Sequence, residues 1–277
     1  MFVILLPNRF RQQPQGAVHL DPAHWFGSRA TFAITGALPD FNAATGKGVS
    51  LTAGGSGFSV RATTHGKSLY TPDGGWVNFD VGQDWAGPNT IVALCRVNTI
   101  NNPWGGLFSK DTGTGFSTQF AIGRDNATDS LYGSVEDSTA ISFGASTIPA
   151  LADYSVIAFT HSGVTSTGVS YYRNGVLIGV TSALPAQPSG SGVLGLGRSR
   201  DVNASYDSDV DWIAFLRAPF VASAAQIKEL SDNIWSIWKA PSRKLWAPSA
   251  PPPAGSTNFR STLSALGTRS GSRQVHR

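Results

Sequence analysis

The stretch Val169-Ser-Tyr-Tyr-Arg-Asn-Gly-Val-Leu-Ile-Gly179 decides the fold class of this 277-residue chain. Two runs rich in β-branched, aliphatic and aromatic residues flank the pair Asn174-Gly175. A type I′ turn requires positive φ at both central residues, and Asn-Gly adopts that conformation readily. The stretch therefore predicts two antiparallel strands joined by a tight turn.

Runs of the same kind fill the chain from residue 26 to about residue 217. They cover residues 90–97, 116–123, 131–135, 140–143, 154–160, 193–197 and 210–216. Turn signals separate them, among them Asp73-Gly74-Gly75, Asp125-Asn126 and Pro188-Ser-Gly190. Many short strands at this spacing indicate a β-sandwich or a β-barrel.

The overall composition also favours an all-β fold. Only 14% of the residues are charged and 41% are hydrophobic, with 31 glycines and 16 prolines. Soluble domains commonly carry about 25% charged residues. Long stretches rich in lysine, glutamate and alanine are nearly absent, which excludes a helical bundle, a coiled coil and a chain kept unfolded by its charge.

One short helix is predicted near the end of the β region. Ser223-Ala-Ala-Gln226 matches a capping box, in which the serine side chain caps the helix and the glutamine reaches back to the serine backbone. A core-facing stripe of apolar residues follows at Ile227, Leu230 and Ile234. Trp235 and Trp238 are expected to pack the end of this segment against the sandwich.

The composition divides the chain into three parts. Residues 1–25 form an N-terminal arm that begins with a short apolar run, and residues 26–240 form the β-sandwich. Residues 241–277 combine a proline-rich hinge with a basic C-terminal tail. Neither end holds enough apolar residues to bury a core, so we expect both to become ordered against a partner surface. Their anchoring residues are Phe2, Ile4, Leu5, Phe259, Leu263, Arg269 and Arg273.

The net charge of +4 lies mainly in the two ends of the chain. Residues 256–277 hold four arginines and no acidic residue. A basic end can contact an acidic protein surface or nucleic acid, or it can be a solvated tail. We favour protein partners over nucleic acid. No membrane contact is expected, because the apolar run at residues 2–6 is too short to cross a bilayer and lacks the basic start of a signal peptide.

The single cysteine, Cys95, stands in the apolar run at residues 90–97. One cysteine cannot form an internal disulfide, and no metal-ligand spacing surrounds it. We predict that Cys95 is a small buried core residue. A fold without disulfides fits assembly inside a reducing cytoplasm.

The residues offer no motif for catalysis. None of the five histidines pairs with another at a metal-ligand spacing, and no Gly-x-Ser-x-Gly or phosphate-binding glycine motif occurs. Glycoside hydrolysis needs two carboxyl groups across one cleft. Glu136 and Asp137 are adjacent, so on a strand their side chains point to opposite faces. We therefore predict that the protein is not an enzyme.

Asp207, Asp209 and Asp211 alternate along the chain, so on a strand their carboxylates share one face. In the interpretation that we favour, they make structural hydrogen bonds where the buried run at residues 212–215 begins. In the alternative they bind Ca²⁺, which prefers hard oxygen ligands. A catalytic role is the least favoured. No other cofactor is expected.

Three tryptophans stand beside glycine or proline in loop-like sequence: Trp76, Trp85 and Trp104. Sugars have apolar faces that stack on exposed aromatic rings, and neighbouring asparagine and aspartate side chains bind the hydroxyls. These loops are therefore candidates for a carbohydrate-binding site. The alternative is that the three rings fold onto the edge of the sandwich.

The second half of the chain resembles the concanavalin A-like, laminin G-like (LamG) jelly roll. The resemblance rests on residues 154–160, 169–179, 194–198 and 209–216, followed by Ser223-Ala-Ala-Gln-Ile-Lys-Glu-Leu. In that family a strand ending in Asn-Gly or Asp-Gly turns back on itself, and a late strand carrying aspartate leads to a short helix. The resemblance covers roughly residues 26–235 and implies a jelly-roll β-sandwich without assigning a ligand.

The two ends resemble LamG-type proteins that tailed bacteriophages and prophages encode. This resemblance rests on residues 8–18 and 230–241, and it is partial because Ile234 stands where proline is common. It implies a component of the virion head or tail that is assembled in the host cytoplasm. It also implies contacts with other capsid or tail proteins, in a homo-oligomer or in many copies.

Three functions from different classes follow from these observations. The first is a non-enzymatic structural virion protein that is anchored through its terminal arms and displays a glycan-binding sandwich. The second is a carbohydrate-binding adhesin for host-surface polysaccharide. The third, a glycan-cleaving enzyme, is least favoured because no strand carries a suitable pair of carboxylates.

Overall fold

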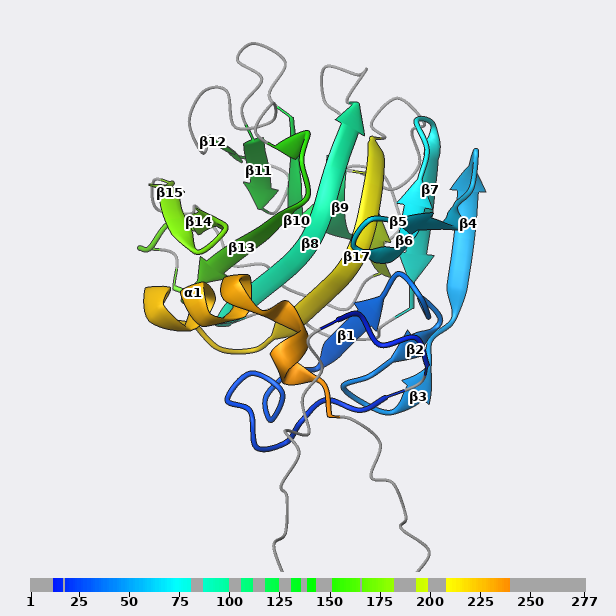
Figure 1. The fold of residues 1–277 in the computed structure, drawn as a ribbon. Coiled ribbons are helices and arrows are strands. Elements are labelled where there is room, and N and C mark those ends of the chain that lie inside the picture. The colour runs from blue at the N-terminus through cyan, green and yellow to red at the C-terminus, as the bar shows by residue number, and fades with distance from the viewer. Residues whose placement is uncertain are drawn as a thin grey trace, which may run out of the picture. The chain divides into compact units, whose positions relative to one another are not determined.

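The computed structural model is a two-layer β-sandwich with one short helix, which confirms the all-β prediction (Figure 1). It describes residues 12–16, 18–80, 87–99, 106–111, 118–124, 131–135, 139–142, 151–164, 166–181, 193–198 and 208–239. The predicted anchoring residues lie outside these ranges: Phe2, Ile4, Leu5, Phe259, Leu263, Arg269 and Arg273. By its internal contacts the chain divides into two units, Met1–Pro241 and Ser242–Arg277.

The first layer is an eight-stranded sheet with the order β15-β14-β13-β8-β17-β6-β5, in which β1 also pairs with β17. Its strands are β1 (Phe32–Thr35), β5 (Ser59–Thr63), β6 (Gly66–Thr71), β8 (Asn89–Thr99), β13 (Ser155–His161), β14 (Ser170–Arg173), β15 (Val176–Val180) and β17 (Asp209–Ala218). The two longest, β8 and β17, form the centre and pair antiparallel from Asp209 opposite Thr99 to Ala218 opposite Thr90.

The second layer is a seven-stranded sheet with the order β12-β11-β10-β9-β16-β7-β4. Its strands are β4 (Leu51–Gly55), β7 (Gly75–Phe79), β9 (Gly106–Asp111), β10 (Thr118–Arg124), β11 (Leu131–Val135), β12 (Thr139–Ser142) and β16 (Val193–Leu196). A short pair, β2 (Phe41–Asn42) and β3 (Lys47–Gly48), stands apart from both layers. Figure 1 shows the two layers one behind the other.

The inner core fills the space between the two sheets. The ring centroid of Phe108 lies 5.6 Å from that of Phe159 and 5.3 Å from that of Phe215, so residues of both layers meet there. Cys95 is fully buried in this core, as predicted, and burial raises the pKa of its thiol to about 12. The thiol therefore stays protonated and packs as a small apolar group.

The stretch that decides the fold class forms the predicted hairpin of β14 and β15. Asn174 and Gly175 have φ angles of 49° and 80°, as a type I′ turn requires. The turn is tied to β13, because the backbone N–H of Val156 donates to the Asn174 side chain at 2.9 Å. β15 is the edge of its sheet, and its exposed apolar side chains are Val176, Leu177, Ile178 and Val180.

A second apolar layer, called here the outer core, covers the lower outer face of the eight-stranded sheet. It lies under α1 (Ala224–Asp232) and the 3-10 helix η3 (Ile234–Ile237), which cross this face in Figure 1. Its buried helical residues include Ile227, Leu230, Ile234, Trp235 and Trp238, as the sequence predicts. The capping box is also confirmed, because Ser223 and Gln226 exchange both predicted hydrogen bonds.

The N-terminal segment, described from residue 12 onward, contacts the sandwich. Leu20 forms a β-bridge with Trp238, and the backbone N–H of Asp21 donates to the Ile237 carbonyl at 2.6 Å. Val18 and Leu20 are buried in the outer core. The sequence alternates only weakly here, because the segment binds through isolated contacts and not as a continuous strand.

Candidate functional site

The outer face of the eight-stranded sheet has a covered lower half and an open upper half. The change falls at a β-bulge in β17, where Trp212 stands opposite Cys95 and Ala214 stands opposite Leu94. Ile213 is the extra residue, and its carbonyl accepts from the backbone N–H of Gly36 at 2.8 Å. Below the bulge the outward residues join the outer core, whereas above it they are acidic.

Above the bulge, Asp211 is the centre of a hydrogen-bonded cluster, called here the Asp211 cluster. Its carboxylate is fully buried. Its partners come from β5, β6 and β8: Arg61 Nε at 2.6 Å and Nη2 at 2.5 Å, Ser68 Oγ at 2.7 Å, Arg96 Nη2 at 3.0 Å and Asn98 Nδ2 at 3.2 Å. The bidentate pair with Arg61 fixes the plane of that guanidinium group.

The charge state of Asp211 follows from its surroundings. Burial acts to raise the pKa of this carboxyl, but the hydrogen bonds from Arg61, Ser68 and Asn98 outweigh it and hold the pKa below its usual value. Asp211 is therefore ionised at neutral pH. The side chains of Arg61 and Arg96 remain 36% and 35% exposed, so two partly exposed guanidinium groups cover the buried carboxylate.

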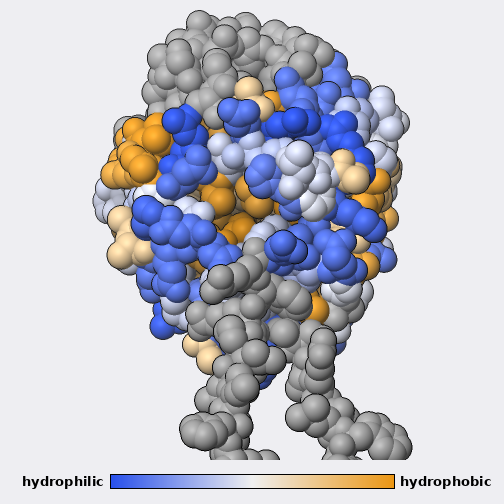
Figure 2. Space-filling model, viewed as in Figure 1, coloured by the Kyte–Doolittle hydropathy of each residue, from blue (hydrophilic) through white to orange (hydrophobic). Residues whose placement is uncertain are grey.

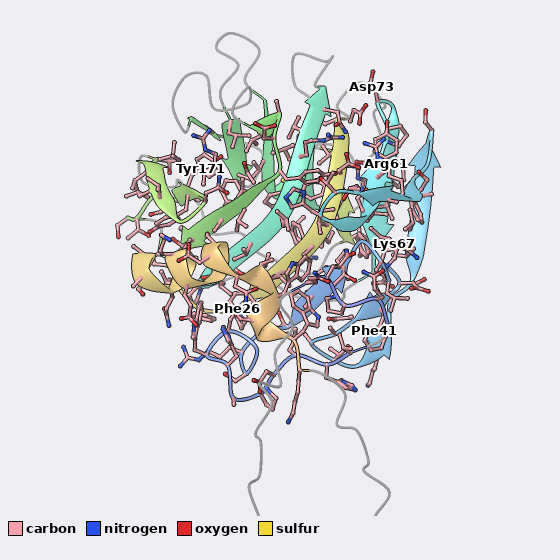
Figure 3. The ribbon with its side chains drawn as sticks, viewed as in Figure 1. Phe26, Phe41, Arg61, Lys67, Asp73 and Tyr171 are labelled. Atoms are coloured by element: carbon pink, nitrogen blue, oxygen red, sulfur yellow. The ribbon has the colours of Figure 1, made fainter. Side chains whose placement is uncertain are left out.

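Aromatic rings lie beside these guanidinium groups and form what we call the aromatic row. Arg61 lies 3.5 Å from the ring centroid of Tyr70, and Arg96 lies 5.0 Å from that of Tyr154. The ring of His65, on the β5–β6 turn, lies 4.5 Å from the ring of Tyr154 at an interplanar angle of 42°. Such contacts hold each ring in a fixed orientation on the open half of the sheet. Figure 3 places Arg61 beside β5 and β6.

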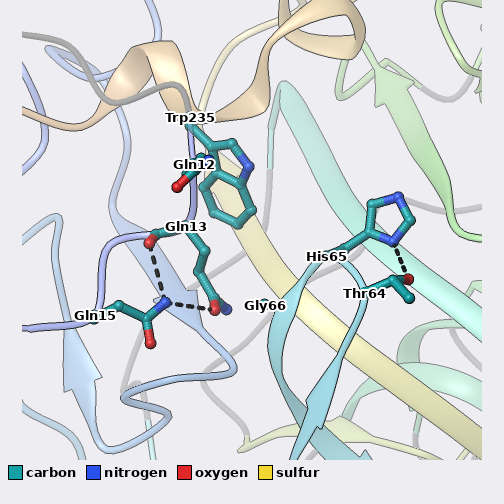
Figure 4. A pocket seen from close by; sticks show the side chains of 7 residues that line it. All are labelled: Gln12, Gln13, Gln15, Thr64, His65, Gly66 and Trp235. Atoms are coloured by element: carbon teal, nitrogen blue, oxygen red, sulfur yellow. Dashed lines mark hydrogen bonds between the residues drawn. The ribbon is translucent and has the colours of Figure 1, made fainter.

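A groove of about 520 Å³ opens next to the aromatic row (Figure 4). Three segments distant in sequence line it: the N-terminal segment, the β5–β6 turn and η3. The lining residues are Gln12, Gln13, Gln15, Thr64, His65, Gly66 and Trp235. Figure 2 shows apolar surface in the middle of this side of the molecule with hydrophilic residues around it. His65 belongs to both the groove and the aromatic row.

One wall of the groove is fixed by the side chain of Gln13. Its Nε2 donates to the carbonyl of Lys67 at 2.5 Å, and its Oε1 accepts from the backbone N–H of Lys67 at 2.6 Å. Nε2 also donates, at 3.2 Å, to the carbonyl of Ile213 at the bulge. Gly66 lets this side chain approach, because a Cβ there would lie 2.3 Å from Gln13 Oε1.

Two of the three predicted acidic residues, Asp209 and Asp211, share a face, as their alternation indicates. Asn98 Nδ2 contacts Asp209 at 2.9 Å and Asp211 at 3.2 Å, and Tyr70 Oη donates to Asp209 at 3.1 Å. These contacts match the structural interpretation, because protein donors occupy both oxygens of Asp211. Asp207 lies outside the described residues, so the Ca²⁺ site stays a prediction. Within the described ranges, no group of acidic, histidine and cysteine side chains is placed to hold a metal ion.

Of the three candidate tryptophans, Trp76 is described, whereas Trp85 and Trp104 lie outside the described residues. Trp76 lies in strand β7, which corrects the loop expected there. Its ring covers Gly54 on the neighbouring strand, where a Cβ would lie 1.9 Å from a ring carbon. The guanidinium of Arg198 lies 4.3 Å from its ring centroid. The protein itself thus occupies ring surface that a sugar would use.

The groove and the aromatic row cannot be predicted from the sequence, because they join residues far apart in the chain. Arg61 and Asp211 are 150 residues apart, and Gln13 and Ile213 are 200 residues apart. A local signal exists only for Arg96 and Asn98, which alternate with the buried Cys95 and Val97 along β8.

No helix in the part of the chain that the structure describes is long and apolar enough to span a membrane.

No protein-family model matches the sequence, and no curated protein is similar to it in sequence. Solved structures are similar in fold. The binding domain of Paraclostridial Mosquitocidal Protein 1 matches with a TM-score of 0.55 and 10% identity over 74% of this chain and 52% of that chain. A structure of botulinum neurotoxin type C, whose cell entry depends on interaction with two ganglioside molecules, matches with a TM-score of 0.55 and 13% identity over 75% of this chain and 51% of that chain.

A third similar structure is domain 4 of AbnA, a GH43 extracellular arabinanase from Geobacillus stearothermophilus, in complex with arabinotriose. It matches with a TM-score of 0.53 and 12% identity over 73% of this chain and 98% of that domain. This chain spans about half the length of the two toxin structures. At these identities the likeness defines the fold class, a jelly-roll-like β-sandwich, and leaves the ligand to the site itself.

Proposed function

We propose that this chain is a non-enzymatic carbohydrate-binding β-sandwich whose binding surface is the groove and the aromatic row. The observation that carries the proposal is the groove itself, in which aromatic rings and side-chain amides converge on an open sheet face. Support also comes from the fold, because one similar domain holds arabinotriose and one similar toxin depends on interaction with two ganglioside molecules for cell entry. Concave sites with rings and a few placed polar groups are typical of small-ligand binding.

The side chains suit the chemistry of a sugar. Pyranose and furanose rings present apolar C–H faces, which pack on the rings of His65 and Tyr154 beside the largely buried Trp235. Their hydroxyls both donate and accept hydrogen bonds, as do the amides of Gln12 and Gln15 at the groove wall. Rings and amides of this kind bind a saccharide without needing a charged partner.

Binding without cleavage is the expected outcome. A glycosidase needs one carboxylic acid that donates a proton and a second carboxylate across the sugar. Asp211 is ionised, buried and held by two arginines, so it has no proton to donate. Asp209 is bonded to Tyr70 and Asn98. Among the described groove residues, none carries a carboxyl group.

The biological setting that we propose is a phage particle. The resemblance of residues 8–18 and 230–241 to LamG-type phage proteins supports it. In this setting the terminal residues anchor the chain to capsid or tail proteins, and many copies display the sandwich toward host-surface polysaccharide. Multiple weak sites on one particle bind a cell surface with high avidity. An isolated adhesin is the alternative.

The binding proposal is tested with the full chain on a glycan array and by calorimetry with the strongest hits. Tyr154→Ala removes the ring between Arg96 and His65 and should abolish or strongly weaken binding. Trp76→Ala is the matched aromatic control on the other sheet and should bind as the wild type does. Retained binding in Tyr154→Ala and lost binding in Trp76→Ala would move the site to the seven-stranded sheet. A wild-type chain that binds no glycan would overturn the proposal.

The phage setting is tested by cosedimentation with capsids and, separately, with host cells. The full chain should sediment with capsids, and a chain lacking residues 1–11 and 242–277 should not. If the shortened chain still joins capsids normally, anchoring through the ends is wrong. Binding of the full chain to cells but not to capsids would favour the isolated adhesin.

A further inference from the structure

We propose that the groove selects an uncharged saccharide, and that Gln13 is a positioning residue that builds the site by holding residues 12–15 as its wall. This inference rests on the proposed carbohydrate binding and names its ligand class and the residue on which the site depends. Two independent observations carry it: the chemistry of the lining, and the bonds that attach the N-terminal segment to the sheet.

The lining favours a ligand without charge. None of the described lining residues is an aspartate, glutamate, lysine or arginine. Nδ1 of His65 is paired with Oγ1 of Thr64 at 3.0 Å. The remaining polar groups are amides, which match hydroxyls better than they compensate a buried ionic charge. An ionic ligand entering this groove would lose hydration without gaining a counter-charge.

Among the described residues, the two arginines beside the aromatic row do not supply that counter-charge. Arg61 and Arg96 both donate to Asp211, and Asp209 lies close to the same cluster. Asp211 and Asp209 lie beside these two guanidinium groups, so an acidic sugar would meet two carboxylates as well as two cations. The Asp211 cluster thus orients Tyr70 and Tyr154 but offers no uncompensated positive charge to an acidic ligand.

The wall depends on a single amide. Gln13 is 6% exposed and bonds both backbone groups of Lys67 as well as the Ile213 carbonyl. The described backbone of the N-terminal segment does not pair with β6 as a strand would. The side chain of Gln13 makes the hydrogen bonds to the β6 backbone instead. Gln15 Nε2 in turn donates to the carbonyl of Gln13 at 3.1 Å, which places Gln15 at the groove. Without the Gln13 amide, Gln12 and Gln15 lose their fixed positions opposite His65.

The experiment measures binding by calorimetry with four probes: arabinotriose and cellotriose, which are uncharged, and trigalacturonic acid and 3′-sialyllactose, which are acidic. The full chain should bind at least one uncharged probe and bind the acidic probes more weakly. Gln13→Ala should weaken binding about tenfold, the effect of losing one well-placed contact. Trp76→Ala should bind as the wild type does, because it lies on the other sheet.

A second variant tests the groove wall in case Gln13→Ala does not fold. If Gln13→Ala unfolds, the double variant Gln12→Ala with Gln15→Ala changes exposed side chains and tests the same wall. It should keep the unfolding midpoint of the wild type in urea and weaken binding of the uncharged probe about tenfold. Unchanged binding in both Gln13→Ala and the double variant would overturn the role of the wall, while the proposed function would stand.

Two further outcomes separate this inference from the proposed function. Stronger binding of the acidic probes would overturn the ligand class and leave carbohydrate binding intact. Tighter binding by a chain lacking residues 1–11 and 242–277 would contradict a groove that is accessible in the full chain, because the ends of the chain would then be competing with the saccharide. No binding of any saccharide would overturn both proposals together.

Discussion

Strand β17 crosses the outer face of the eight-stranded sheet, and its two halves have different partners. Below the bulge, Ile213 and Leu216 are fully buried under the helices and the N-terminal segment. Above it, Asp209 and Asp211 bind partly exposed arginine, tyrosine and asparagine side chains and the buried Ser68. One strand thus joins a surface stabilised by apolar burial to a surface stabilised by charge-assisted hydrogen bonds.

The difference shows how a sheet face stays open without being apolar. The covered half removes apolar area from water, which stabilises the fold by roughly 25 cal/mol per Å². The open half carries no such cover, and its polar side chains form hydrogen bonds with one another around Asp211. Because the rings of Tyr70 and Tyr154 lie against guanidinium groups, they stay ordered and accessible together. The binding surface that we propose therefore lies on this half.

The largest effect is expected in the covered half from Trp238→Ala. Trp238 is fully buried in the outer core, and deleting such a side chain should lower the free energy of unfolding by about 4 kcal/mol. Urea unfolding measures the loss. Trp238→Phe is the matched control and should cost much less, because the indole N–H makes no hydrogen bond that would be lost. Equal losses in the two variants would contradict apolar packing as the cause.

The next largest effect is expected in the open half from Asp211→Asn. This change leaves Arg61 and Arg96 without their carboxylate and should cost about 3 kcal/mol, near the lower limit for a buried pair because both arginines are partly exposed. Asp209→Asn is the control and should cost less than half as much. The same urea experiment compares them. A loss in Asp211→Asn no larger than in the control would show that the cluster contributes little.

The two halves should also differ in their dependence on pH. The folded pKa of Asp211 lies below the unfolded value of about 3.9, so its stabilisation is complete above about pH 5 and is lost as the pH falls through the folded pKa. Unfolding midpoints measured from pH 7 to pH 2 should therefore bring the wild type and Asp211→Asn together. The cost of Trp238→Ala should stay constant over the same range. A constant gap for Asp211→Asn would contradict the assignment.

The smallest effect concerns the helix that covers the lower half. Ser223→Ala removes the capping side chain of α1 and should cost about 1 kcal/mol. Ser231→Ala, in the same helix, is the matched control and should be neutral or slightly stabilising, because its hydroxyl has no hydrogen-bond partner. Thermal unfolding resolves both. An equal response of the two variants would mean that the cap does not hold this cover in place.

Local signals made much of the fold predictable from the sequence. Asn174-Gly175 predicts its hairpin because only residues that tolerate positive φ fit the turn, and Ser223 with Gln226 predicts the helix start because a capping box needs only four residues. The shared face of Asp209 and Asp211 follows from the two-residue period of a strand. Each of these inferences depends on neighbours in the chain.

The candidate site was not predictable because its parts meet only in the folded chain. The alternation of β17 gives no sign that Ile213 is a bulge, and the bulge provides the carbonyl that Gln13 binds. The glycines near Trp76 are typical of a loop, whereas Gly54 and Gly75 lie in paired strands and Gly54 leaves space for the Trp76 ring. Partners 150 residues apart leave no local pattern.

The position of β17 between two apolar layers also governs how the molecule opens. Trp212 and Phe215 belong to the inner core, while Ile213 and Leu216 belong to the outer core. Apolar layers therefore cover both faces of the strand. Amide protons at the centre of β17 therefore exchange with deuterium only when the whole sandwich opens, whereas those of the edge strand β15 exchange through local fluctuations.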